Sequence, residues 1–454
     1  MKIDIDTWFQ CDQAKPLCSR CDRLQIPCVG AGSQRYKFME DPKTLESSRS
    51  RQTSRSKSSS SSSPDKGPKE LLLMPSSRTT LLTKALVGKL KTTDDLRYHL
   101  SWTYGGFIED IPRHLGINEA LDASVDALVS THSSLGSHAR GFTSSESLAK
   151  YSYALSAMRL YLDDPKKART VETLCAVMVL LICQSFIGGG DGLYSGHGEG
   201  AAQILKARQY YDPHDEFESK LVLSLRGPVL FEALWNPKIS FTPKEWKRIV
   251  ENGLDGATYE GQMMRCLAYA PDFLKRGRDA LQNKSDLELL RGEVTQQYLE
   301  LKGILSEAHE RFNGYLKSPE SGSGSSKSVT IRTMMHCWYQ RSYGLGLAIC
   351  LMFNCMMKAL YPNDFDLEVE SVDYCRQVLE LTEQAALYRP LAAAWVSICL
   401  IAAWCARSDE EIRGPVEVAL ADYLSDFPSA SRGLGETWRR ELEHTARRFS
   451  LLEI

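Results

Sequence analysis

Apolar residues recur at spacings of three and four along most of this 454-residue chain, and this periodicity restricts the fold more than any other feature. The pattern begins near residue 79 and is clear in the run Leu121, Val125 and Leu128. Such spacing is typical of helices that bury one face. Because no alternating run of useful strand length appears after residue 79, we predict an all-α body over residues 79–454.

Capping and breaking residues set the limits of individual helices. Residues 151–162 form a predicted helix that ends at Asp163-Asp164-Pro165, because proline disfavours helix continuation. Residues 171–187 are apolar on nearly every side, which predicts a central helix, and Gly188-Gly189-Gly190 ends it. Thr93-Asp94-Asp95 predicts a helix start. Further predicted helices cover residues 197–211, 217–235, 243–252, 260–280, 286–315, 331–360, 366–388, 391–407, 414–425 and 433–452.

Composition divides the chain into three segments. Residues 1–40 contain a cluster of cysteines, and residues 41–78 form a Ser-rich basic linker whose composition predicts disorder. The helical body follows, with a predicted flexible insert at residues 318–328. Residues 1–70 carry 13 Lys and Arg against 9 Asp and Glu, whereas the remainder carries 42 against 48. A basic N-terminal segment on an acidic body is consistent with an anionic partner at that segment alone.

The overall composition is that of a globular protein and excludes wholly disordered, collagen-like and strongly nucleic-acid-coating proteins. The chain is 43% hydrophobic and 25% charged, with a formal net charge of -2. The N-terminal residues MKIDIDTWFQ carry acids where a signal peptide needs an apolar run. The longest apolar stretch, residues 391–406, is shorter than the roughly 18 to 20 residues that cross a bilayer. We therefore expect no membrane partner and reduced, intracellular thiols.

Nine of the 13 cysteines are scattered in apolar segments, where cysteine behaves as a small hydrophobic residue. The other four, Cys11, Cys18, Cys21 and Cys28, follow the pattern C-x6-C-x2-C-x6-C. The polar segment around them is too short to bury four thiols in a core, so four unrelated buried cysteines are a poor explanation. Thiolates suit Zn²⁺, which accepts sulfur ligands in a tetrahedron. We predict that these four cysteines bind Zn²⁺.

Residues around and beyond these cysteines form recognisable motifs. In the N-terminal segment they are Cys11-Asp12, Lys15-Pro16, Cys18-Ser19-Arg20-Cys21, Ile26-Pro27-Cys28 and Gln34-Arg35-Tyr36-Lys37-Phe38. Looser motifs in the body are Phe107-Ile108-Glu109-Asp110-Ile111-Pro112-Arg113, Glu172-Thr173-Leu174-Cys175-Ala176, His197 with Gly200-Ala201-Ala202 and Leu205, and Arg226-Gly227 with Glu245-Trp246. With these motifs the chain resembles the fungal binuclear zinc-cluster transcription factors, the Zn(2)-C6 family. In that family six cysteines hold two zinc ions, and the regulatory region is helical.

The resemblance implies a nuclear transcription factor that regulates RNA polymerase II transcription, a role that in this family often concerns metabolic or secondary-metabolite genes. Residues 1–40 would be a partial zinc-cluster domain docked on promoter DNA, and the body would act through transcriptional coregulators. The expected phosphate contacts are Lys15, Arg20, Arg23, Arg35 and Lys37. Asp12 and Asp22 oppose these cations, so we expect weak, salt-sensitive binding.

The N-terminal segment departs from the family pattern. The positions of the family's first two cysteines hold Met1 and Asp4, and its basic stretch is replaced by Ile5-Asp6-Thr7-Trp8-Phe9-Gln10. Two interpretations stay open. Either the start of this polypeptide is truncated or misassigned, or the chain is a degenerate regulator in which the four cysteines hold a single zinc ion. In the second case the alternative function is regulation through protein partners of the helical body, without DNA binding.

Enzyme motifs were considered and none is complete. Gly196-His197-Gly198-Glu199-Gly200 lacks the Lys-Ser/Thr and the preceding strand of a phosphate-binding loop. The same His197 and Glu199 imitate the H-x-E of zinc deaminases, but no P-C-x-x-C follows. His336 beside Cys337 is interpreted as packing. We therefore predict that the chain is not an enzyme.

Overall fold

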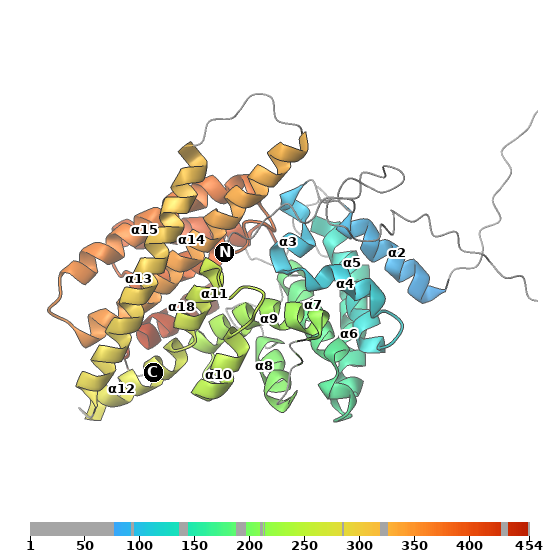
Figure 1. The fold of residues 1–454 in the computed structure, drawn as a ribbon, viewed down its shortest axis with the longest axis horizontal. Coiled ribbons are helices and arrows are strands. Elements are labelled where there is room, and N and C mark those ends of the chain that lie inside the picture. The colour runs from blue at the N-terminus through green and yellow to red at the C-terminus, as the bar shows by residue number, and fades with distance from the viewer. Residues whose placement is uncertain are drawn as a thin grey trace, which may run out of the picture. The chain divides into compact units, whose positions relative to one another are not determined.

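The computed structural model describes residues 77–91, 95–135, 144–187, 197–208, 212, 214–283, 286–317, 326–427 and 435–452. These residues are 82% helical and contain no strand, which confirms the prediction of an all-α body. They all belong to one unit of the chain, Leu73–Ile454. One hydrophobic core includes buried residues from Leu82 to Leu451. Figure 1 shows the arrangement of the helices that contribute them.

The first half of the body consists of short helices around one central helix. Its elements are α2 (Arg78–Leu90), η3 (Leu96–Tyr98), α3 (Leu100–Tyr104), α4 (Phe107–Asp110), η4 (Ile111–Arg113), α5 (Glu119–Leu135), α6 (Ser145–Leu162), η5 (Lys167–Arg169), α7 (Val171–Ile187), α8 (His197–Arg208), α9 (Glu216–Trp235) and α10 (Pro243–Val250). Most residues of α7 are buried, and α7 packs against α5, α6, α8 and α9. The prediction of a central helix at residues 171–187 is therefore confirmed.

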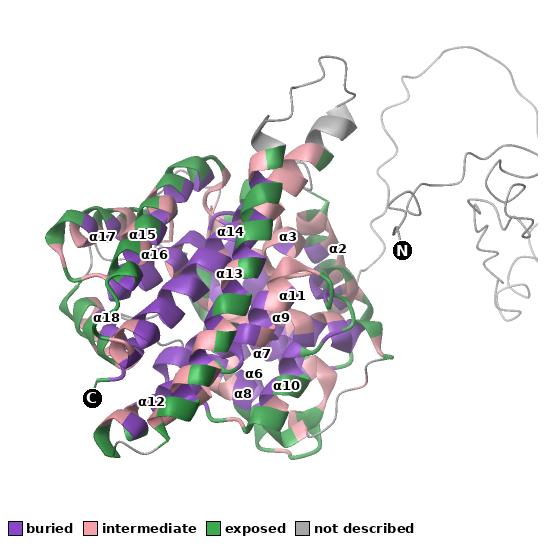
Figure 2. Cartoon of the chain, turned by 60° about the vertical axis from the view of Figure 1, so that its left-hand side comes forward, coloured by how far each residue is buried: buried purple, intermediate pink, exposed green. Residues whose placement is uncertain are grey.

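The second half is built around two long helices that lie side by side. Its elements are α11 (Tyr259–Leu267), α12 (Ala270–Asn283), α13 (Leu287–Lys317), α14 (Ser326–Leu360), α15 (Asp366–Ala385), η6 (Ala386–Tyr388), α16 (Val396–Ala406), α17 (Glu410–Leu424) and α18 (Glu436–Phe449). Arg291 of α13 reaches the end of α14 at Leu360, whereas Phe312 of α13 meets His336, so the two helices are antiparallel. Figure 2 shows buried residues lining α14 where the other helices surround it.

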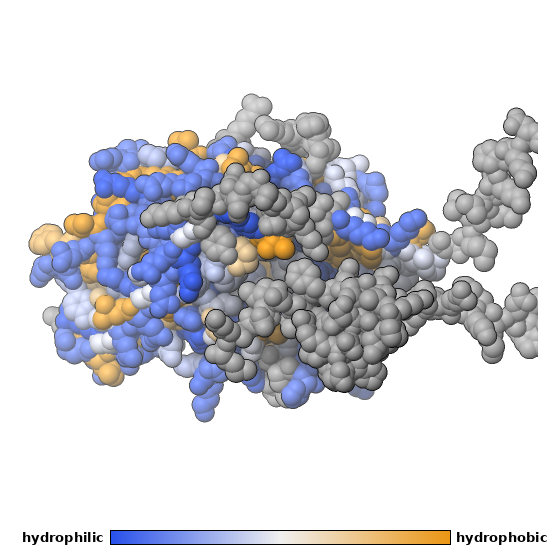
Figure 3. Space-filling view, turned by 45° about the horizontal axis from the view of Figure 1, so that its top comes forward, coloured by the Kyte–Doolittle hydropathy of each residue, from blue (hydrophilic) through white to orange (hydrophobic). Residues whose placement is uncertain are grey.

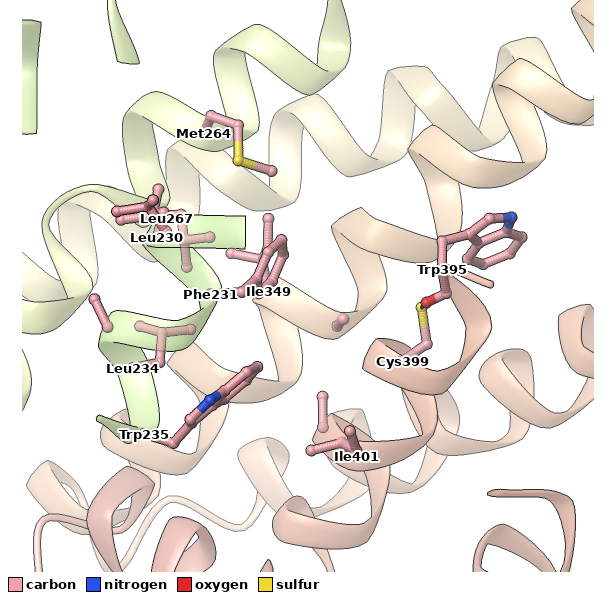
Figure 4. Packing of buried hydrophobic residues seen from close by; sticks show 14 of the residues in the cluster. Leu230, Phe231, Leu234, Trp235, Met264, Leu267, Ile349, Trp395, Cys399 and Ile401 are labelled. Carbon is pink, nitrogen blue, oxygen red and sulfur yellow. Dashed lines mark hydrogen bonds between the residues drawn. The ribbon is translucent and has the colours of Figure 1, made fainter. Parts of the chain in front are cut away.

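The core is continuous between the two halves. Figure 4 shows where it crosses: Phe231 and Trp235 of α9 and Leu267 of α11 face Ile349 of α14 and Ile401 of α16. Within the described residues, Ile331–Leu360 is long and apolar enough to cross a membrane by length and composition, but 89% of its most apolar window is buried inside the fold. On the face drawn in Figure 3, apolar side chains of the described surface are scattered among hydrophilic ones.

Several helix boundaries differ from the predicted ones, each for a local reason. The predicted helix 260–280 is two helices, because Pro271 lacks the N–H that a continuous helix would need and instead lies in the first turn of α12. The predicted helix 414–425 begins at Glu410, because the Asp409 carboxylate accepts a hydrogen bond from the N–H of Ile412 at 3.2 Å and caps it. Residues 391–395 form turns instead of the first turn of α16.

Two further differences concern glycine and the insert. Leu96, Leu100, Tyr104 and Phe107 have helical spacing but lie in three short helices. The extended residue His99 separates η3 from α3, and Gly105, with φ of 112°, separates α3 from α4. The helix α14 begins at Ser326, so the last residues of the predicted insert 318–328 are helical. Residues 318–325 lie outside the described residues, as do Thr93, Asp94 and the three glycines after α7.

Candidate functional site

The residues to which the sequence assigns chemistry lie outside the described part of the chain. They are the predicted zinc ligands Cys11, Cys18, Cys21 and Cys28 and the predicted DNA contacts Lys15, Arg20, Arg23, Arg35 and Lys37. Among the described residues, no three His, Cys, Asp or Glu side chains are grouped so that they could hold a metal ion. The zinc and DNA assignments therefore stay predictions.

The nine cysteines of the body are all free and buried, as the sequence predicted. Burial disfavours the thiolate and raises each pKa: to about 11 for Cys337 and Cys355, and to about 12 for Cys183, Cys266 and Cys375. A protonated thiol is neither a metal ligand nor a nucleophile. These cysteines therefore act as core residues at neutral pH.

The two histidine motifs of the sequence lie in α14 and at the start of α8. His336 packs its ring against Phe312 and Tyr388, and burial lowers its pKa. Its neighbour Cys337 is buried in a small cluster with Leu96. His197 begins α8, but its side chain is not among those described; Glu199 forms an ion pair with Lys238 at 3.8 Å. Because burial raises the pKa of the Cys337 thiol to about 11, the thiolate that a His336–Cys337 nucleophile would need is disfavoured at neutral pH.

The most unusual polar feature of the described body is a set of buried charges on α9. The Arg226 guanidinium forms an ion pair with Asp255, and the two side chains are only 5% and 10% exposed. Arg226 Nη1 also donates a hydrogen bond to the Val250 carbonyl at 3.3 Å, and Asn252 Nδ2 donates one to the Ser219 carbonyl at 3.0 Å. These bonds fasten the connection between α10 and α11 to α9.

A second buried charge of α9 meets the start of α8. Glu232 is 5% exposed, and a Cβ added to Gly198 would lie 2.6 Å from its carboxyl carbon. A side chain at this position would displace the Glu232 carboxylate from the start of α8. A carboxylate at a helix N-terminus is stabilised by the free N–H groups and the helix dipole. The motif around His197 and the motif that begins at Arg226 are therefore brought together by packing between α8 and α9.

The third buried charge of α9, Glu218, forms an ion pair that borders a small cavity. Arg208 of α8 pairs with Glu218 of α9, and Arg208 also donates to the Arg169 carbonyl. The cavity beside them measures about 30 Å³ and lies among α8, α9 and α10. That volume suits a single water molecule and is far below the size of a ligand site. The three buried charged residues of α9, Glu218, Arg226 and Glu232, therefore each have a structural explanation that requires no ligand.

One larger hollow lies at the end of α14 and has about 590 Å³. It is lined by Arg291 and by the surface loop Tyr361, Pro362, Asn363, Asp364, Phe365 and Asp366. The Arg291 guanidinium donates to the Leu360 carbonyl at 3.0 and 2.8 Å and lies 5.1 Å from the centre of the Tyr361 ring. Because its N–H groups bind the last carbonyl of α14, we interpret Arg291 as a structural residue that holds the end of α14 against α13.

Comparison with known proteins gives no relative for this chain: no family model, no curated protein and no solved structure matches it. The Arg226–Asp255 pair and the approach of Glu232 to Gly198 were not predicted from the sequence. A signal was present, because Arg226 and Glu232 interrupt the largely apolar second half of α9. Charges in such a position are stable only when paired.

Proposed function

We propose that this protein is a zinc-dependent transcriptional regulator whose N-terminal segment holds the metal and whose helical body controls activity through protein partners. The observation that carries the proposal is the pattern C-x6-C-x2-C-x6-C formed by Cys11, Cys18, Cys21 and Cys28. The body supports it indirectly: its nine cysteines are explained as buried core residues, so the four N-terminal ones need a separate reason.

The four cysteines fit Zn²⁺ chemically. Four thiolates complete a tetrahedral site with no open position, which is the form of a structural site rather than a catalytic one. A closed site of this kind can contribute on the order of 10 kcal/mol to folding a small segment. Its role here would be to hold Lys15, Arg20, Arg23, Arg35 and Lys37 in place for promoter phosphates. The nuclear location and the RNA polymerase II context belong to the same proposal.

Zinc content and thiol reactivity of the full chain test the metal site. We expect one Zn²⁺ per chain and almost no fast-reacting thiol in the native protein, because burial protects the nine body cysteines and zinc protects the other four. A chelator such as EDTA should release the metal and expose four thiols, while the circular dichroism of the helical body stays unchanged.

A matched pair of variants gives the control. Cys21→Ser should lose the zinc, whereas Cys337→Ser removes a body thiol and should keep it. Two zinc ions per chain would contradict a single four-cysteine site, and a metal-free protein with four fast thiols would remove the basis of the proposal.

DNA binding separates this function from its alternative, a regulator that has lost DNA contact and acts only through its helical body. Mobility-shift assays at about 50 and 200 mM salt should show a complex that weakens steeply, since phosphate contacts release counterions. Cys21→Ser should abolish the shift if zinc organises the contact residues. A zinc-loaded protein that leaves DNA free at the lower salt concentration would favour the alternative.

A further inference from the structure

The first helix of the body, α2, is basic over its whole length. Between Arg78 and Lys91 it carries four cations, Arg78, Lys84, Lys89 and Lys91, and no acidic residue. The Ser77 side chain caps the helix by accepting the N–H of Thr80 at 3.1 Å, so the charges are arranged on a well-formed helix. The local charge of +4 contrasts with the acidic body that follows.

Only one side of α2 packs against the body. Leu82 and Leu86 are its buried residues, and it contacts α5, α3 and η4. Figure 1 shows α2 at the edge of the body beside α5. The outward side carries Lys84, Gly88 and Lys91, all exposed, together with Leu81, which is 57% exposed. A Cβ at Gly88 would meet no atom within 4 Å, so this side is open.

Two of these cations have no counter-charge in the described part of the chain. Lys84 and Lys91 take part in no ion pair there, although other surface cations do; Lys150, for example, pairs with Asp126 and Glu146 at 3.1 and 3.0 Å. Seven residues separate Lys84 from Lys91, which places them on one side of the helix about 10 Å apart. Such a row suits a polyanion with closely spaced charges, such as duplex DNA.

The position of α2 in the chain supplies the second argument. Fifty residues separate Cys28, the last predicted zinc ligand, from Arg78. Most of these residues belong to the predicted Ser-rich linker, residues 41–78, which as a flexible chain would have a root-mean-square end-to-end distance of about 34 Å. Any DNA held by the N-terminal segment is therefore at a high effective concentration around α2.

We propose that the outward face of α2 is an accessory binding surface for the phosphate backbone of DNA, with Lys84 and Lys91 as its contacts. This inference rests on the proposed function, since it requires that the chain binds DNA. The contacts are independent of base sequence: they strengthen binding and increase its salt dependence. The surface belongs to the body, so it does not involve the zinc ligands.

The test measures DNA binding by the full zinc-loaded chain as a function of salt, using fluorescence anisotropy of a labelled duplex. Lys84→Gln/Lys91→Gln should lower the slope of log K against log salt by about 1.8, or 0.9 for each lost phosphate contact. The matched control is Lys238→Gln/Lys247→Gln, which removes the same charge from side chains that are 75% and 71% exposed elsewhere on the body. The control should keep the wild-type slope.

Three results would contradict the proposed role of α2. An unchanged slope in the α2 variant would overturn the inference and leave this face to another partner, such as an acidic protein. An equal fall in both variants would also overturn it, because net charge alone would then explain the effect. A wild-type chain that does not bind DNA at about 50 mM salt would contradict the proposed function together with this inference. The α2 variant should unfold at the wild-type temperature, since Lys84 and Lys91 are exposed. The control should unfold close to that temperature, since exposed ion pairs contribute little to stability.

Discussion

Arg226→Leu should destabilise the body by about 3–5 kcal/mol, because it leaves the buried Asp255 carboxylate without its cation. The Val250 carbonyl also loses a hydrogen bond from Arg226. The Asp255 side chain is 10% exposed, so the unpaired carboxylate would have little access to bulk water. Equilibrium unfolding in urea, followed by the helical circular dichroism signal, measures the change.

Two further variants isolate the cause. Arg226→Leu/Asp255→Asn removes both charges and should recover part of the lost free energy, because no buried charge is left unpaired. Lys247→Leu breaks an exposed pair with Glu251 and should cost at most about 1 kcal/mol. If the free energy of unfolding of Arg226→Leu lies within about 1 kcal/mol of the wild-type value, the Arg226–Asp255 pair does not stabilise the fold as proposed.

Gly344→Ala should destabilise the body by about 1–3 kcal/mol or more, because α14 and α16 touch at this residue. An added Cβ would lie 2.7 Å from Cη2 of Trp395 and closer still to Cζ3. The Cys399 thiol donates a hydrogen bond to the Gly344 carbonyl at 3.1 Å, which confirms how near the two helices are. Figure 4 shows Trp395 and Cys399 side by side.

The control for this prediction uses a glycine in an open position. A Cβ at Gly303 of α13 would meet nothing within 4 Å, so Gly303→Ala should stabilise the protein by about 0.5–1 kcal/mol through its higher helix propensity. The same urea unfolding experiment compares the two variants. A Gly344→Ala protein as stable as the wild type would show that Trp395 moves aside at little cost.

Much of the body was predictable because its signals are local. The limits of α7 follow from a run of apolar residues, and those of α9, α13 and α15 agree with the predicted ranges to within a few residues. The start of α17 was predicted less well. The predicted helix began at Gly414, whereas Asp409 caps a helix that begins at Glu410 and contains Pro415. A cap can outweigh a nearby proline when the following turns pack well.

The candidate functional groups divide into one site that the sequence predicts and buried contacts that it does not predict. Spacing alone predicts the zinc site of Cys11, Cys18, Cys21 and Cys28, since its ligands lie within 18 residues of one another. The partners of Arg226 and Glu232 were not predictable, because Asp255 is 29 residues away and Gly198 is 34 residues away in the chain. Periodicity indicates which side of a helix is buried, but it contains no information about which distant segment covers that side.

By itself, the sequence determined that the body is helical, that its nine cysteines lie in the core, and that the N-terminal cysteines have the spacing of a zinc site. Only the tertiary structure decided how the helices meet. It places Gly198 next to Glu232 and Gly344 against Trp395, and it leaves Lys84 and Lys91 of α2 exposed at the edge of the body. The physical reason is the sequence distance over which each interaction acts. Helix formation depends on residues three or four positions apart, whereas close packing and charge pairing depend on segments that only the folded chain brings together.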